Sequence, residues 1–218
     1  MRSRRTVAVY IDGFALYKAL LQHTYPQYKW LDLEAFARRL FPHRDVVQVK
    51  YFSAQLKPRT NDPGIGQRQQ IFWRALRTTG VEIIEGKFAF VKQRLPLHPE
   101  QLDPSGKVVT TLIKRPEEKG SDVALASHLI FDAVDAVADS YAVLTNDSDL
   151  APPVEMLTQR GHDIALVSVA GASYNKAFDA AGIRTVRQIR QGTLSASQFP
   201  LTLVDGEGRT IRKPPSWP

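Results

Sequence analysis

Two short apolar segments of this chain end in aspartates. Residues 6–11 are followed by Asp12, and residues 141–144 are followed by a polar run that contains Asp147 and Asp149. Apolar runs of this kind predict buried strands, and parallel strands present their carboxyl ends at one edge of a sheet, where α/β enzymes carry their chemistry. Carboxylates that meet at neutral pH repel one another unless a cation neutralises them, so the pattern predicts a divalent metal site.

Each acid also has a structural alternative. Asp12 stands between a strand and a helix and can serve as an N-cap, and Asp122 falls in the first turn of a predicted helix, where the helix dipole favours an acid. Asp147 and Asp149 are harder to explain in this way, because a cap requires only one of them. Taken together, Asp12, Asp122, Asp147 and Asp149 are interpreted as one site.

The expected cation is Mg²⁺ or Mn²⁺. Both are hard cations that prefer oxygen ligands, and both are commonly held by a few carboxylates together with a substrate phosphate. Such a cation activates water and stabilises charge on a scissile phosphate. Asn146 and Ser148 lie between the acids and can position water or donate to a phosphate oxygen, with turn formation as the alternative. The five histidines show no ligand spacing, so zinc is not expected.

Composition points to one cytoplasmic domain and an anionic partner. With 218 residues, 43% of them hydrophobic, the chain can form a single core, and without cysteine it has neither disulfides nor thiolate metal sites. The basic residues 1–5 resemble the start of a signal peptide, but Asp12 interrupts the apolar run that follows, and no segment has transmembrane length. We therefore expect no membrane partner. The net charge of +7 favours a polyanionic substrate, although basic composition alone is common.

Several side chains are candidates for substrate contact. Phe14 and Tyr17 lie close enough in sequence to Asp12 to stack on a base, with core packing as the alternative. Two groups of arginines can follow a phosphate backbone or form a solvated basic face. The first group is Arg68, Arg74 and Arg77, and the second is Arg184, Arg187 and Arg190.

Strands alternate with helices along most of the chain. This order predicts a three-layer α/β sandwich with a mainly parallel sheet, interrupted by an antiparallel excursion and closed by a C-terminal hairpin. The predicted strands are residues 6–11, 45–53, 81–84, 88–91, 108–113, 141–144 and 164–169, and the hairpin pairs 201–204 with 210–212. The predicted helices are residues 14–21, 31–40, 67–78, 121–137, 153–160 and 175–181.

Three segments resemble the signature motifs of bacterial NYN domains, also called LabA-like, within the PIN-like nuclease superfamily. They are residues 9–14, 117–126 and 145–150, and parts of the tail beyond residue 189 are also similar to that subgroup. The resemblance implies a Rossmann-like PIN fold and a metal-dependent ribonuclease acting on single-stranded RNA, with an NYN domain over 1–192 and a packed extension over 193–218. It places Asp12, Asp122, Asp147 and Asp149 at the catalytic and metal positions. The substrate contacts that we expect beside them are Asn146, Ser148, Phe14, Tyr17, Arg68 and Lys119.

The chain departs from the motif at one position. The family usually carries Asn three residues after its first Asp, whereas this chain has Ala15. A PIN-like RNA-binding module with weak or no turnover is therefore an alternative. A sugar-nucleotide transferase is another, since residues 147–149 satisfy a bare Asp-x-Asp pattern. A homodimer formed through the C-terminal hairpin is a further expectation.

Overall fold

A seven-stranded sheet forms the centre of the molecule. The computed structural model describes residues 4–58, 60–169 and 174–218. Its strands are β1 (Thr6–Asp12), β2 (Asp45–Ala54), β3 (Glu82–Pro96), β4 (Thr110–Lys119), β5 (Tyr141–Leu144), β6 (Ile164–Ser168) and β7 (Thr185–Gln188), with β8 (Thr202–Val204) and β9 (Thr210–Arg212) in a separate hairpin. The strand order is β4-β3-β2-β1-β5-β6-β7, and only β4 runs antiparallel to its neighbour. The predicted mainly parallel α/β sheet is confirmed.

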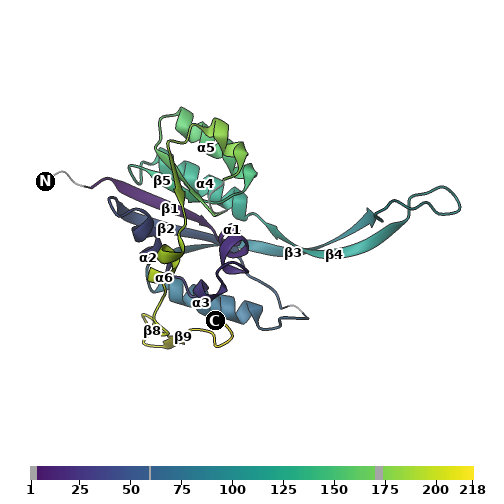
Figure 1. Ribbon diagram of the computed structural model, residues 1–218, viewed down its shortest axis with the longest axis horizontal. Helices are drawn as coiled ribbons and strands as arrows, with labels where there is room; N and C mark the ends of the chain where they lie inside the picture. Colours follow the sequence, from purple (N-terminus) through teal and green to yellow (C-terminus); the bar gives the residue numbers. More distant parts are fainter. Residues whose placement is uncertain (1–3, 59, 170–173) are drawn as a thin grey trace.

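Helices cover both faces of this sheet. The helices are α1 (Gly13–Leu16), α2 (Leu33–Leu40), α3 (Ile65–Arg77), α4 (Ser121–Val134), α5 (Ala151–Gln159) and α6 (Gln191–Ala196). Shorter turns are the π-helical η1 (Tyr17–Leu21) and the 3₁₀ turns η2 (Pro26–Tyr28), η3 (Ser148–Leu150) and η4 (Lys176–Ala181). In Figure 1, α4 and α5 lie above the sheet and α3 and α6 below it. Helices α1 and α2 belong to the same core as α3 and α6, whereas α4 and α5 form the other core.

The side chains of β1 alternate between two cores. Val7, Val9 and Ile11 pack with the layer that contains α2 and α3, whereas Ala8 and Tyr10 pack with α4 and α5. This period of two is the pattern of a strand buried on both faces. The chain therefore forms the predicted three-layer sandwich, with β1 at its centre.

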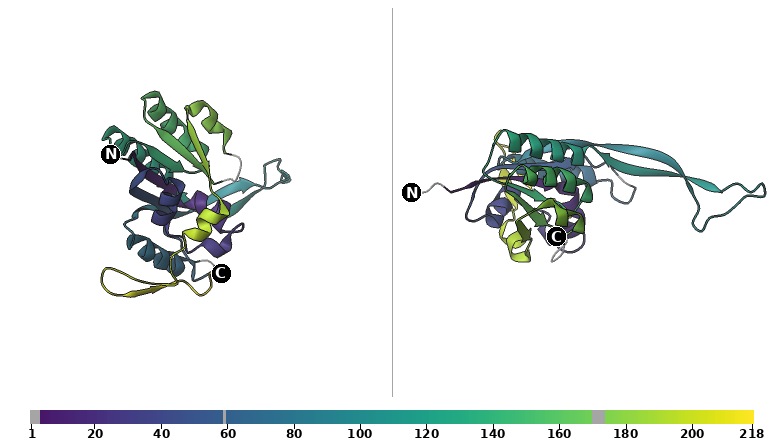
Figure 2. Two further views of the ribbon diagram at one scale, coloured as in Figure 1. Left: turned by 60° about the vertical axis from the view of Figure 1, so that its left-hand side comes forward. Right: turned by 90° about the horizontal axis from the view of Figure 1, so that it is seen from above.

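The antiparallel excursion is longer than the sequence predicts. Two strands were expected over 81–84 and 88–91, but β3 is continuous and pairs residues 87–96 with the whole of β4. At Gly86, the last residue of β3 that pairs with β2, an added Cβ would meet the Ser121 hydroxyl. The expected strand over 108–113 starts later, at Thr110. Figures 1 and 2 show β3 and β4 projecting from the body as an arm.

Edge strand β7 was not predicted. Its residues alternate between partly buried and exposed positions, as edge strands do, and it pairs in parallel with β6. Three arginines spaced every third residue at this point suggested a basic face instead. One of them, Arg187, lies over the Phe41 ring at 4.9 Å. Arg187 thus packs against Phe41, which is remote in sequence, so local periodicity could not indicate the strand.

The C-terminal segment contacts the layer of α2 and α3. The Trp30 indole donates to the Pro200 carbonyl at 2.8 Å, and the Phe199 N–H donates to the Trp30 carbonyl at 3.0 Å. The predicted hairpin forms as β8 and β9, and Asp205 in its turn pairs with Arg74 at 3.0 Å. Within the described residues there is no helix of the length and apolarity needed to cross a membrane.

Candidate active site

The two acid-bearing strand ends are neighbours in the sheet. Strand β1 pairs with β5 in parallel, with Ile11 opposite Leu144, so Asp12 and Thr145 leave the sheet side by side. The sequence forms these ends because each apolar strand is followed at once by residues that favour turns and caps. Asp12 is the N-cap of α1, and Asp147 is the N-cap of η3. The capping role considered as the alternative for Asp12 therefore exists, whereas Asp147 caps the turn η3 and not helix α5.

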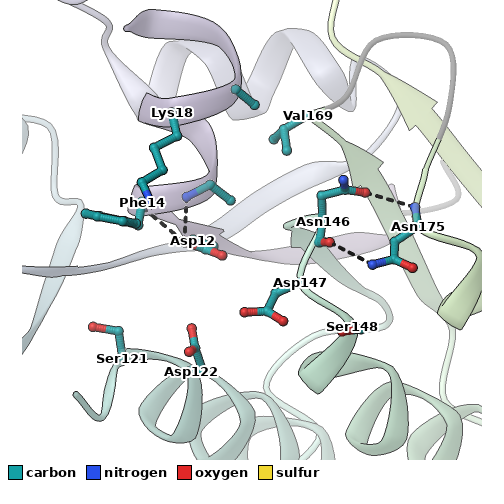
Figure 3. Close-up of a pocket in the computed structure, with 12 residues that line it drawn as sticks. Asp12, Phe14, Lys18, Ser121, Asp122, Asn146, Asp147, Ser148, Val169 and Asn175 are labelled. Carbon is teal, nitrogen blue, oxygen red and sulfur yellow. Dashed lines mark hydrogen bonds between the residues drawn. The ribbon is translucent and has the colours of Figure 1, made fainter. Parts of the chain in front are cut away.

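Three of the four candidate acids line one pocket at this edge. Asp12, Asp122 and Asp147 surround a cavity of about 570 Å³, together with Asn146 and Ser148. In Figure 3 the three carboxylates point toward the space between them, from β1, from the start of α4 and from the turn after β5. The edge thus holds carboxylate oxygens contributed by three separate segments of the chain.

Asp12 is the most buried of these acids. Its side chain caps α1 by accepting the N–H groups of Phe14 at 3.0 Å and Ala15 at 2.9 Å on Oδ1, while Oδ2 accepts the Thr145 hydroxyl at 2.9 Å. Burial raises the pKa of the Asp12 carboxyl above its ordinary value, these hydrogen bonds lower it in part, and the charge of Asp147 raises it. Because Oδ1 already accepts two bonds, Oδ2 is the atom with a lone pair left for a further ligand.

Thr145 links the two central acids. Its buried hydroxyl donates to Asp12 and accepts the N–H of Asp147 at 3.1 Å. Asp147 Oδ1 in turn accepts the N–H of Asp149 at 3.0 Å. Sequence reasoning missed this role of Thr145. The available signal was a hydroxyl at the point where a buried strand meets the acidic run.

A buried polar network fixes helix α4, which carries Asp122. Asp132 on α4 accepts the Tyr10 hydroxyl and the Lys50 ammonium, each at 2.6 Å, and Lys50 also lies 3.1 Å from Nδ1 of His128. Burial and the neighbouring Asp132 raise the pKa of the Tyr10 hydroxyl. Because Tyr10 belongs to β1 and Lys50 to β2, the network holds the acid-bearing helix against the acid-bearing strand.

Asn146 is held in place by Asn175. The Asn146 Oδ1 accepts the Asn175 N–H at 2.9 Å, and the Asn175 amide donates to the Asn146 carbonyl at 3.2 Å (Figure 3). Two donors remain on the Asn146 amide nitrogen, which has no hydrogen-bond partner in the described parts of the chain. Asn175 was not among the candidate residues, but it orients the candidate Asn146.

The other candidates lie in different places. Asp149 is exposed and does not line the acidic pocket, because the chain enters the turn η3 at Ser148. Tyr17 and Arg68 line a second pocket, and Phe14 lines both pockets. Lys119 is exposed at the end of β4 and lines neither of them. The structure shows where each candidate lies, and the roles assigned to all of them stay predictions.

Carboxylate oxygens are atoms of the type that Mg²⁺ or Mn²⁺ prefers, but those at this pocket do not form a closed cage. Among the described residues no three His, Asp or Glu side chains are grouped closely enough to hold a metal ion. Mg²⁺ usually keeps several waters and takes only one or two protein carboxylates, with substrate phosphate completing its shell. The buried Asp12 beside Asp147 fits that open arrangement, since a cation would relieve their repulsion.

Comparisons with known proteins agree with this architecture. The profile of the NYN domain matches residues 6–186, which covers most of the chain. The chain belongs to the NYN domain family. The resemblance seen in the three motifs is thereby confirmed, and with it a PIN-like nuclease fold.

This NYN domain is similar to one protein in sequence and to another in structure. A 6-hydroxy-3-succinoylpyridine 3-monooxygenase from Pseudomonas putida is 30% identical, over 96% of this chain and 74% of the relative. A crystallised protein of unknown function from Vibrio parahaemolyticus matches with a TM-score of 0.55 at 17% identity, over 88% of this chain and 96% of that chain. The structural match supports the fold of this NYN domain and nothing beyond the fold.

Proposed function

We propose that this NYN domain hydrolyses phosphodiester bonds of single-stranded RNA and that it depends on Mg²⁺ or Mn²⁺. The observation that carries the proposal is the meeting of Asp12, Asp122 and Asp147 at one pocket of a nuclease-like fold. A basic chain of net charge +7 around an acidic pocket suits a polyanion whose reacting phosphate enters with a cation.

The residues have distinct tasks in this scheme. Asp12 Oδ2 and the Asp147 carboxylate are the oxygens that would hold the cation, and Asp122 adds charge from α4. A cation held there supplies a Lewis acid that lowers the pKa of water and offsets phosphate charge. The free donors of the Asn146 amide orient a phosphate oxygen, and Lys18, which also lines the pocket, attracts the nucleic acid. Asp149 is proposed to act from outside the pocket, on an approaching strand or cation.

Cleavage of labelled single-stranded RNA tests this function. Purified protein with Mn²⁺ should release fragments, and EDTA or Asp147→Asn should stop their release. The Asn side chain keeps the oxygen that accepts the Asp149 N–H, so this variant removes charge and preserves the cap. RNA binding without metal-dependent cleavage would instead identify an RNA-binding module.

A second candidate is hydroxylation of a heteroaromatic acid. It is favoured by the Pseudomonas putida relative, which is 30% identical over 96% of this chain. Monooxygenation places one atom of O₂ on the ring and reduces the other to water, with two electrons from a reductant. Oxygen uptake with 6-hydroxy-3-succinoylpyridine and NADH, with no RNA present, distinguishes this reaction from hydrolysis.

A further inference from the structure

A second pocket lies beside the acidic one. It encloses about 340 Å³, near the lower end of the range of about 300–1,000 Å³ that is usual for small-molecule sites. Phe14 and Lys18 line both pockets, so helix α1 and the following turn η1 form the wall between them. A ligand in the second pocket would therefore lie next to the acids.

Aromatic rings form much of this second pocket. The lining includes Phe14, Tyr17, Tyr51, Phe72 and Trp217, contributed by α1, η1, β2, α3 and the C-terminal segment. Phe72 packs edge-on against both Tyr51, at 6.2 Å between ring centroids, and Trp217, at 5.9 Å. Rings held by their neighbours in this way present flat apolar surfaces that suit a planar ligand.

The charges at the same pocket are predominantly positive. Lys18, Lys29 and Arg68 line it, against the single carboxylate of Asp62, which pairs with Arg68. Lys29 lies over the Tyr17 ring at 5.8 Å, and no carboxylate in the described parts of the chain forms an ion pair with it. Burial, followed by the nearby Arg68 charge, lowers the pKa of Lys29. Three cations therefore line a pocket that contains one acid, an imbalance that a bound anion would correct.

We propose that this pocket binds a planar heteroaromatic ring that carries a negatively charged group. The ring packs among Tyr17, Phe72 and Trp217, and the anionic group meets Lys29. The chemistry fits both a pyrimidine nucleotide and a pyridine bearing a carboxylate side chain. The inference goes beyond both proposed functions, because binding here requires neither cleavage nor oxygenation.

Binding of small probes in the presence of EDTA tests the proposal. Calorimetry should detect binding of uridine 5′-monophosphate or 6-hydroxy-3-succinoylpyridine. Uridine, which lacks the phosphate, should bind at least tenfold more weakly than its phosphate, and succinate, which lacks the ring, should bind more weakly than the pyridine acid. Tighter binding of the nucleotide would indicate RNA or its products as the source of the ring, and tighter binding of the pyridine acid would indicate a small-molecule substrate. EDTA removes the cation, so binding is measured without metal-dependent catalysis. The result therefore does not depend on whether the protein is a ribonuclease.

Four variants locate the binding. Lys29→Gln should weaken binding of the anionic probes at least tenfold, whereas Lys29→Arg should retain it. The matched control Lys107→Gln, on the exposed arm, should leave the affinity unchanged. Tyr17→Leu should weaken uridine and its phosphate alike, and urea unfolding establishes that each variant folds. Unchanged binding in Lys29→Gln, succinate binding as tightly as the ring acids, or no binding at millimolar concentration would each overturn the proposal.

Discussion

Replacing Thr145 by Val should destabilise the fold and do so more at neutral than at acid pH. The two side chains have the same shape, and Thr145 is completely buried, so the change removes the hydroxyl without opening a cavity. Two hydrogen bonds are lost, one to the Asp12 carboxylate at 2.9 Å and one from the Asp147 N–H at 3.1 Å. A bond to a charged group is worth about 1.5–3 kcal/mol and a neutral one about 0.5–1.5 kcal/mol, so the free energy of unfolding should fall by about 2–4.5 kcal/mol at pH 7.

The pH dependence follows from the Asp12 carboxyl. Its pKa in the folded protein is raised above the ordinary value, so the folded state favours the protonated acid and loses stability as pH rises through that pKa. The Thr145 hydroxyl opposes this rise by favouring the charged form. Without it the Asp12 pKa rises further, so the deficit of Thr145→Val should grow with pH. At acid pH the protonated Asp12 carboxyl forms only a neutral hydrogen bond with the hydroxyl, so the two lost bonds together cost about 1–3 kcal/mol.

Urea unfolding at several pH values between 4 and 7, followed by tryptophan fluorescence, measures both effects. Thr145→Ser is the matched control, because it keeps the hydroxyl and loses one methyl group, worth about 1 kcal/mol at every pH. Equal losses in the Val and Ser variants, or a loss in Thr145→Val that does not vary with pH, would refute the role assigned to this hydroxyl.

Three further changes test the site and its support. Asp147→Asn should weaken Mn²⁺ binding at least tenfold in calorimetry while leaving urea stability equal or higher, since repulsion with its neighbour is removed; intact Mn²⁺ affinity would place the cation elsewhere. Ala15→Asn restores the amide of the family motif. Because a hydrogen bond to a charged group is worth about 1.5–3 kcal/mol, the rate of RNA cleavage should rise by roughly one to two orders of magnitude. An unchanged rate would show that the missing amide does not limit turnover. Gly13→Ala should cost about 1–3 kcal/mol in urea unfolding, because its Cβ would lie 2.5 Å from the Tyr51 ring, and Gly192→Ala, which meets nothing within 4 Å, is the control expected to be neutral or to stabilise by about 0.5–1 kcal/mol.

The positions of Asp12 and Asp147 could be predicted because they depend on few assumptions. Both follow apolar strands, and parallel strands share one carboxyl edge whatever their order in the sheet. The sequence does not state that β1 and β5 are neighbours, yet that pairing places the acids side by side. Asp122 required only that a helix begin near residue 121, which α4 does.

Features that depend on turns or on distant segments could not be predicted. Asp147 and Asp149 would share a face if the strand continued, but the chain turns at η3, so only Asp147 lines the pocket. The aromatic pocket requires Trp217 to return from the C-terminus and pack on Phe72. No local period records such a contact, because it arises from packing between segments far apart in sequence.

Helix capping does not explain why Asp12 is an acid. The α1 cap uses only Oδ1, and an Asn side chain would offer the same oxygen to the Phe14 and Ala15 N–H groups without a charge. The carboxylate instead adds a buried charge that Asp147 repels, at a cost to the folded state. A cation held between the acids, as in the proposed function, would offset both costs. This reasoning applies whether the substrate is an RNA phosphate or a heteroaromatic acid.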